Sequence, residues 1–151
     1  MIDSNEIKGL RLAGIDFGLA RLGVAVCDEF HITVTPVSVL DPREDNFWTK
    51  LTSLLTEKAV KAIVLGLPIP QNNSQTELMD IIKNFGDELH LKTGLIVYYH
   101  DESFSSKRAA ETMVSIGKKK KDRRTKGALD RVAAAVILRS FLEEIEGGFY
   151  V

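Results

Sequence analysis

Apolar residues gather in short runs along the first part of the chain, which is the pattern of strands. Residues 11–17 and 22–28 form two such runs, and the residues between them leave room only for a tight turn. Such a short connection predicts an antiparallel hairpin. Residues 33–40 carry a third apolar run and are expected to add a third strand.

Farther along the chain, helical and strand patterns alternate. Apolar residues recur at helical spacing from Phe47 to Ala59, and residues 62–66 follow as an apolar run typical of a buried strand. The same reasoning predicts the remaining elements: a helix that starts near Ser74, a strand over 95–99, a helix over 105–116 and a helix over 128–145. This order predicts an α/β fold in which helices flank a five-stranded mixed sheet, with antiparallel strands 1–3 and parallel strands 4–5.

The size and composition are those of an ordinary folded domain. The chain has 151 residues, of which 44% are hydrophobic and 27% are charged, and we expect one domain over residues 1–151. The single cysteine, Cys27, cannot form an internal disulfide. The sequence shows neither the pattern of a signal peptide nor an apolar run of membrane-spanning length. These features predict a cytoplasmic protein with no membrane partner.

The net charge of −1 conceals a strong asymmetry. Residues 107–131 hold ten Lys or Arg against three Asp or Glu, a local balance of +7, so the rest of the chain carries −8. A basic segment of this kind favours a directional anionic partner such as a nucleic acid. A solvated loop without a partner, flexible over about 117–126, explains the same charges equally well.

Three acidic residues occur at the edges of apolar sequence, where an uncompensated negative charge is costly. Asp16 ends the first strand, Glu102 follows the fifth strand together with Asp101, and Asp130 lies in the first turn of the last helix. Each has an ordinary explanation as a turn aspartate, a helix cap or an acid favoured by the helix dipole. Hard oxygen ligands from separate elements, however, suit Mg²⁺ or Mn²⁺, which in turn handle phosphate. The combination predicts a metal-dependent nuclease.

The histidines and the single tryptophan do not add to this site. His31, His90 and His100 show no metal-ligand spacing to one another. We interpret His31 and His90 as surface or packing residues and Trp48 as a core residue. His100 lies beside the acidic pair and could modulate it.

Five short motifs occur in a specific order and spacing. They are Gly14-Ile15-Asp16-Phe17-Gly18, Arg21-Leu22-Gly23-Val24-Ala25-Val26, Gly66-Leu67-Pro68, Asp101-Glu102 and Leu129-Asp130-Arg131-Val132-Ala133-Ala134. Together they resemble the YqgF/RuvX family, small RNase H-like proteins described as Holliday junction resolvases and as pre-16S rRNA nucleases. The resemblance covers the chain from Gly14 to about Leu142.

The resemblance implies an RNase H-like fold and a catalytic site built from the same three acids. Asp16, Glu102 and Asp130 would hold two divalent ions, Mg²⁺ or Mn²⁺, for hydrolysis of phosphodiester bonds. The leading expectation is processing of the 5′ end of pre-16S rRNA in ribosome biogenesis, and the alternative substrate is branched DNA for a Holliday junction resolvase. A monomer and a homodimer both fit these substrates. The expected nucleic-acid contacts are cationic: Arg21, Lys107, Arg108, Lys118, Lys119, Lys120, Lys121, Arg123, Arg124 and Lys126.

Two departures from the family's pattern bear on this expectation. The family usually has an arginine after its Asp-Glu pair, but here Ser103 follows Glu102. Lys107 or Arg108 could supply the missing charge, or the chain could be a nucleic-acid-binding factor that has lost catalysis. The milder departure is Asn73, which stands where the family usually has glycine, since asparagine tolerates the left-handed conformation better than most residues.

Overall fold

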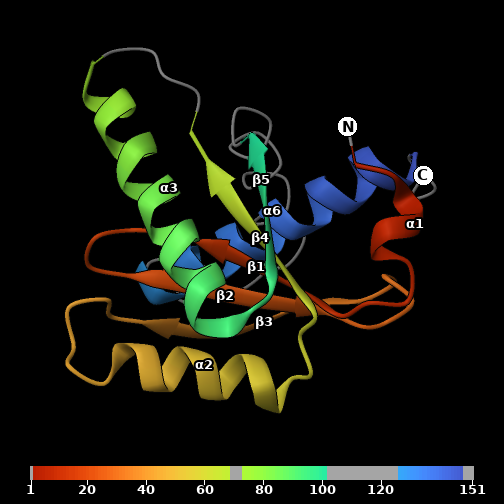
Figure 1. Cartoon of the computed structure of the whole chain (residues 1–151), viewed down its shortest axis with the longest axis horizontal. Coiled ribbons are helices and arrows are strands. Elements are labelled where there is room, and N and C mark those ends of the chain that lie inside the picture. Colours follow the sequence, from red (N-terminus) through yellow and green to blue (C-terminus); the bar gives the residue numbers. More distant parts are fainter. Residues whose placement is uncertain (1, 69–72, 102–125, 148–151) are drawn as a thin grey trace.

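The computed structural model describes residues 2–68, 73–101 and 126–147, with side chains described throughout except at 73–75 and 126–131. A short helix and three successive strands come first, and helices then alternate with strands (Figure 1). In chain order they are α1 (Ser4–Ile7), β1 (Leu12–Asp16), β2 (Leu22–Cys27), β3 (Val34–Leu40), α2 (Phe47–Glu57), β4 (Ala62–Leu67), α3 (Asn73–Thr93), β5 (Ile96–Asp101) and α6 (Lys126–Glu146).

The strands form one mixed sheet in the order β3-β2-β1-β4-β5. β1 pairs antiparallel with β2, and β2 pairs antiparallel with β3. β4 lies parallel to β1 on one side and to β5 on the other. The predicted five-stranded mixed sheet is therefore confirmed, including the direction of every strand.

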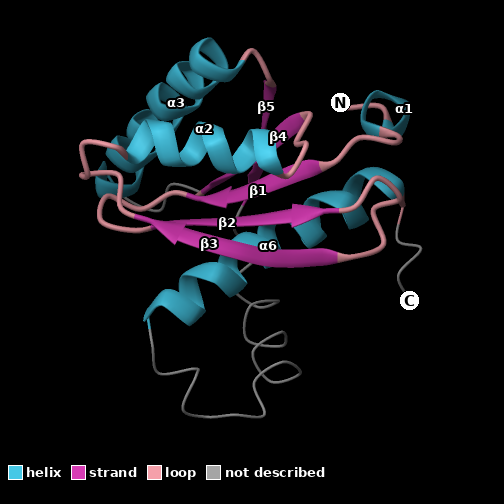
Figure 2. Ribbon diagram, turned by 90° about the horizontal axis from the view of Figure 1, so that it is seen from below, coloured by secondary structure: helices cyan, strands magenta, loops and turns pink. Residues whose placement is uncertain are grey.

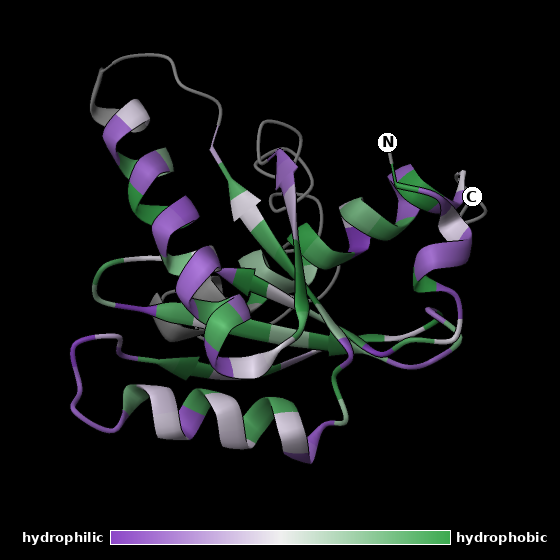
Figure 3. Ribbon diagram, viewed as in Figure 1, coloured by the Kyte–Doolittle hydropathy of each residue, from purple (hydrophilic) through white to green (hydrophobic). Residues whose placement is uncertain are grey.

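Helices cover both faces of the sheet. α2 and α3 lie on one face and α6 lies on the other (Figure 2). The strand segments between them are strongly hydrophobic, whereas polar residues recur along α3 (Figure 3). Because residues alternate between the two faces of a strand, Ala13 and Ile15 pack in the core beneath α2 and α3, and Leu12 packs in the core beneath α6.

Gly14 allows α6 to approach β1 closely. A Cβ atom built at Gly14 would lie 2.7 Å from the carbonyl oxygen of Ala134 and 2.7 Å from the Cβ of Leu138. Real Cβ atoms essentially never come so near other heavy atoms. Since Ala134 and Leu138 are both fully buried, α6 has no room to give way, and its position on the sheet depends on a glycine at this point.

The last turn of α6 is held near the start of β1. His31, which lies in the β2–β3 connection and is 2% exposed, has its Nδ1 atom 2.8 Å from a carboxylate oxygen of Glu146. Its Nε2 atom lies 2.7 Å from the carbonyl oxygen of Leu10, just before β1. α6 therefore runs antiparallel to β1, and its first residues lie toward the end where β1 stops (Figure 1, Figure 2). The packing role predicted for His31 is confirmed.

The observed elements differ from the predicted ranges by only a few residues. α3 begins at Asn73, slightly before the predicted start. The predicted helix over 105–116 lies outside the described residues. α1, with four residues, was not predicted, because so short a helix shows no periodicity. Among the described residues, no helix is both long and apolar enough to cross a membrane.

Candidate functional site

The three parallel strands end at the same edge of the sheet. Ile15 of β1 is in register with Leu65 of β4, and Leu65 is in register with Tyr99 of β5. One residue farther along, β1 ends at Asp16 while β5 reaches His100, and Asp101 then ends β5. Ligands of open α/β sheets gather at this kind of edge.

Asp16 is partly buried and lies at the carboxyl end of β1, opposite Gly23 of β2. It is two residues after Gly14 and four after Leu12, both of which contact α6. Since alternate strand residues share a face, Asp16 lies on the face of the sheet that α6 covers. Its carboxylate is therefore directed to the side from which the last helix approaches.

α6 brings a second predicted acid toward the same edge. Asp130 lies in the first turns of α6, one helical turn before Ala134, whose backbone contacts β1 at Gly14. Because α6 runs antiparallel to β1, this turn of the helix lies toward the Asp16 end of the strand. The side chain of Asp130 is outside the described residues.

His100 ties the end of β5 to α6. It is 5% exposed, its Nδ1 atom lies 3.1 Å from a carboxylate oxygen of Glu144, and its Nε2 atom lies 2.9 Å from the hydroxyl oxygen of Ser140. A carboxylate only accepts, so Nδ1 carries the proton and Nε2 accepts from the Ser140 hydroxyl. Burial lowers the pKa of His100 from its ordinary value, although Glu144 and Asp101 oppose that shift. A neutral imidazole thus bridges strand and helix.

The hydrogen-bonded series Ser140–His100–Glu144 has the residue types of a hydrolase catalytic triad. Here, however, Ser140 is only 7% exposed and sits in the interior of α6. A substrate carbonyl cannot reach such a hydroxyl, so the three side chains form a structural link rather than a nucleophilic centre.

We expect His100→Phe to lower the free energy of unfolding by about 1–3 kcal/mol, because it leaves the buried Ser140 hydroxyl without its acceptor. Urea denaturation followed by circular dichroism measures this loss. Glu144→Gln serves as the matched control: the Glu144 side chain is 61% exposed, so its replacement should cost less than about 1 kcal/mol. Equal losses for the two variants would contradict the assigned hydrogen bonds.

Cationic residues border the same edge of the sheet on the β3 side. Arg21 is exposed and immediately precedes β2, whose first residue pairs with the last residue of β3. Asp41 follows β3, and hydrogen bonds from Arg43 hold the pKa of its carboxyl at about 2, with a smaller contribution from the positive charge of Arg21. The pairing of Leu22 with Leu40 puts Arg21 beside Asp41, at the edge where Asp16 ends β1.

The described residues include only part of the predicted site. Asp16 and Arg21 are described in full, and Asp130 and Lys126 only as backbone of α6. Within the described side chains, no group of three or more possible metal ligands occurs. The other predicted site residues lie outside the described ranges: Glu102, Lys107, Arg108, Lys118, Lys119, Lys120, Lys121, Arg123 and Arg124.

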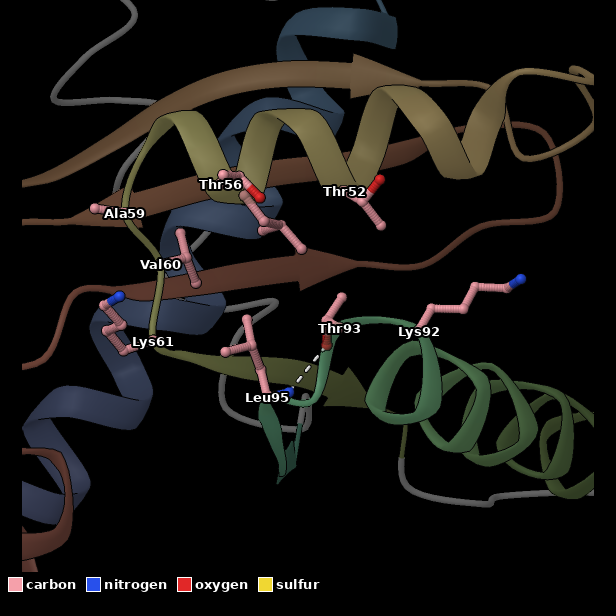
Figure 4. Close-up of a pocket in the computed structure, with 9 residues that line it drawn as sticks. Thr52, Thr56, Ala59, Val60, Lys61, Lys92, Thr93 and Leu95 are labelled. Atoms are coloured by element: carbon pink, nitrogen blue, oxygen red, sulfur yellow. Dashed lines mark hydrogen bonds between the residues drawn. The ribbon is translucent and has the colours of Figure 1, made fainter.

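Two hollows occur on the face covered by α2 and α3. One, of about 300 Å³, lies between the carboxyl-terminal ends of α2 and α3 and includes Thr56, Lys61 and Leu95 (Figure 4). Because Lys61 precedes β4 and Leu95 precedes β5, this hollow is at the edge of the sheet away from Asp16. The other, of about 320 Å³, begins at Phe17, directly after Asp16.

Comparison with known proteins decides the family. The model of a family described as "RuvX: Holliday junction resolvase" matches residues 10–144. The chain belongs to the RuvX family. A relative from Bacteroides fragilis, named "Putative pre-16S rRNA nuclease", is 35% identical over 134 residues, which is 88% of this chain and 96% of the relative. Membership of this family makes the chain a hydrolase that acts on phosphodiester bonds.

Solved structures show the same fold at low sequence identity. Thermus thermophilus RuvC, in complex with a Holliday junction substrate, superposes with a TM-score of 0.56 at 17% identity, covering 90% of this chain and 96% of that one. The yeast mitochondrial resolvase Ydc2 gives a TM-score of 0.59 at 12% identity and covers 91% of this chain and 80% of that one. The predicted RNase H-like fold is confirmed.

Proposed function

We propose that this member of the RuvX family is a metal-dependent endonuclease that matures the 5′ end of pre-16S rRNA in the cytoplasm during ribosome biogenesis. The position of Asp16 carries the proposal, because it puts a carboxylate at the carboxyl edge of the sheet on the face that α6 covers. The name of the Bacteroides fragilis relative supports RNA as the substrate.

The register of the sheet favours Glu102 over Asp101 as the partner of Asp16. His100 faces α6, as its contacts with Ser140 and Glu144 show. Successive strand residues point to opposite faces, so Asp101 belongs to the other face. We propose that this alternation continues one residue beyond β5, so that Glu102 belongs to the face of His100 and Asp16 and, with Asp130 from α6, completes the carboxylate set.

Carboxylate oxygens are the donors that Mg²⁺ and Mn²⁺ prefer, so Asp16, Glu102 and Asp130 fit a site for two such ions. Bound there, these ions would activate a water molecule and stabilise the leaving oxygen. Of the three residues, Asp16 belongs to β1 and the backbone of Asp130 belongs to α6. Arg21 and the basic segment of residues 107–131 would neutralise the phosphate backbone of the substrate and fix its position.

The proposal is tested by cleavage assays on two substrates, a pre-16S rRNA leader and a four-way DNA junction, each with Mg²⁺, with Mn²⁺ and with a chelator. We expect metal-dependent cleavage of the RNA at defined positions. Cleavage of only the four-way junction would indicate that branched DNA, and not RNA, is the substrate. Tight binding without cleavage under every metal condition would contradict the proposal and identify a nucleic-acid-binding factor, the outcome that Ser103 makes conceivable.

A further inference from the structure

An open groove lined mainly by aromatic and apolar side chains begins beside Asp16. Its volume is about 320 Å³, near the lower limit of pockets for small organic ligands. Phe17, the next residue after Asp16, forms one end of it, and α2 and α3 supply most of the rest. The lining residues are Phe17, Pro42, Phe47, Trp48, Ile81, Asn84, Phe85 and Glu88.

Flat aromatic rings dominate the groove. Phe85 stands at its centre, 4.7 Å from the ring centroid of Phe17 and 5.3 Å from that of Trp48. Phe85 is 8% exposed, but Phe17 and Trp48 are only partly buried. The interpretation of Trp48 as a core residue is therefore only half right, because the protein leaves part of two large rings in contact with solvent next to its candidate site.

Polar groups occur at the mouth of the groove. Asn84 and Glu88 are exposed on successive turns of α3, and both line the groove. An amide offers a hydrogen-bond donor and an acceptor, and a carboxylate offers acceptors. An apolar slot with a few polar groups at its mouth suits a flat heterocycle with polar edges.

Charged pairs flank the groove on both sides. The Nζ atom of Lys92 lies 5.1 Å from the ring centroid of Trp48 and 3.8 Å from a carboxylate oxygen of Glu88. On the opposite side, Pro42 lines the groove, and the pairing of the start of β2 with the end of β3 puts Arg21 beside Asp41. Because each cation has a carboxylate beside it, stacking on the aromatic rings, rather than an excess of positive charge, would hold a base in this groove.

We infer that this groove binds one unpaired nucleobase of the substrate strand, beside the bond that is cut. Phe17 directly follows Asp16, and the two side chains lie toward opposite faces at the end of β1. A strand that crosses this edge of the sheet would therefore place a phosphate at Asp16 and a base of the same or a neighbouring nucleotide against Phe17. A base inside a duplex is stacked and cannot enter such a slot. The inference rests on the proposed nuclease function and narrows its substrate to strands with an unpaired nucleotide at the cleavage position.

The single tryptophan makes the inference directly measurable, since Trp48 lines the groove. The Asp16→Asn variant, which should bind without cutting, is titrated with a single-stranded oligonucleotide, with the same sequence as a duplex and with an abasic oligomer of equal length. We expect the single strand to quench Trp48 fluorescence, and the duplex and the abasic oligomer to leave it unchanged. Equal quenching by all three ligands would overturn the inference.

Variants in the same background separate the groove from simple charge attraction. Phe17→Leu keeps an apolar side chain but removes a ring, and it should weaken single-strand binding about tenfold, or about 1.4 kcal/mol. Phe30→Leu is the matched control: Phe30 is 71% exposed in the β2–β3 connection, at the other end of the sheet, and its loss should change nothing. Equal affinities of the two variants for the single strand would show that the groove does not bind a nucleobase.

A second groove variant tests binding at an exposed position, where the substitution should not disturb folding. Ile81 lines the groove and is 39% exposed, so Ile81→Glu should fold normally while its charge repels the phosphate backbone. It should weaken single-strand binding and reduce quenching, and unchanged binding would count against the groove. The experiments also distinguish the two proposals. Quenching without any cleavage would support the base-binding groove but not the nuclease function, and cleavage without quenching would support the nuclease function but not the groove.

Discussion

Gly14→Ala should lower the free energy of unfolding by about 3 kcal/mol. The new Cβ would lie 2.7 Å from the carbonyl oxygen of Ala134 and from the Cβ of Leu138. Overpacking of a buried contact typically costs about 1–3 kcal/mol. Here the neighbouring oxygen belongs to the helix backbone, which cannot move aside as a flexible side chain can. Since α6 also carries Asp130, its displacement should lower nuclease activity as well.

Gly94→Ala is the matched control, because it makes the same chemical change in open space. No atom lies within 4 Å of a Cβ built at Gly94, but its φ of +73° is strained for alanine, so a loss of about 1 kcal/mol is expected. Thermal and urea denaturation of both variants measure the difference. If Gly14→Ala costs no more than Gly94→Ala, the close contact between β1 and α6 does not hold in solution.

Asp16→Asn should abolish cleavage while leaving the fold intact. A bound metal ion supplies several kcal/mol of transition-state stabilisation, and each 1.36 kcal/mol is a factor of ten in rate. Loss of a ligand carboxylate should therefore slow cleavage by about a thousandfold or more. The thermal midpoint should change little, because Asp16 is only partly buried and asparagine has nearly the same size and shape as aspartate.

The control for this variant is Asp80→Asn, which makes the same change on an exposed surface of α3. It should cleave at the rate of the unmodified protein. A similar rate for Asp16→Asn and Asp80→Asn would show that the activity comes from another site or from a contaminating nuclease.

The sequence was sufficient to predict the sheet because burial and periodicity are local signals. The short turn between the first two strands predicted an antiparallel hairpin, and the apolar run over 62–66 predicted a strand covered on both faces. Both are observed, the strand as Ala62–Leu67. The order of strands and the face that each helix covers depend on contacts between distant segments, and only the structure provides them.

The site was predicted only in part, for the same reason. A sequence shows that Asp101 and Glu102 are adjacent, but only the structure shows that His100 faces α6, which puts Asp101 on the other face of the sheet. The aromatic groove was missed because Phe17, Trp48 and Phe85 come from three segments far apart in the chain. Each of them alone has the pattern of a core residue, and one sequence carries no signal that two of them remain partly exposed.

Mn²⁺ binding followed by electron paramagnetic resonance tests whether Asp16, Glu102 and Asp130 hold divalent ions together. We expect two Mn²⁺ ions per chain, magnetically coupled because paired catalytic metals lie about 3.5–4 Å apart. Each of Asp16→Asn, Glu102→Gln and Asp130→Asn should abolish the coupled signal, whereas Asp80→Asn should retain it. Unchanged Mn²⁺ binding by the triple variant would show that these three carboxylates do not form the metal site.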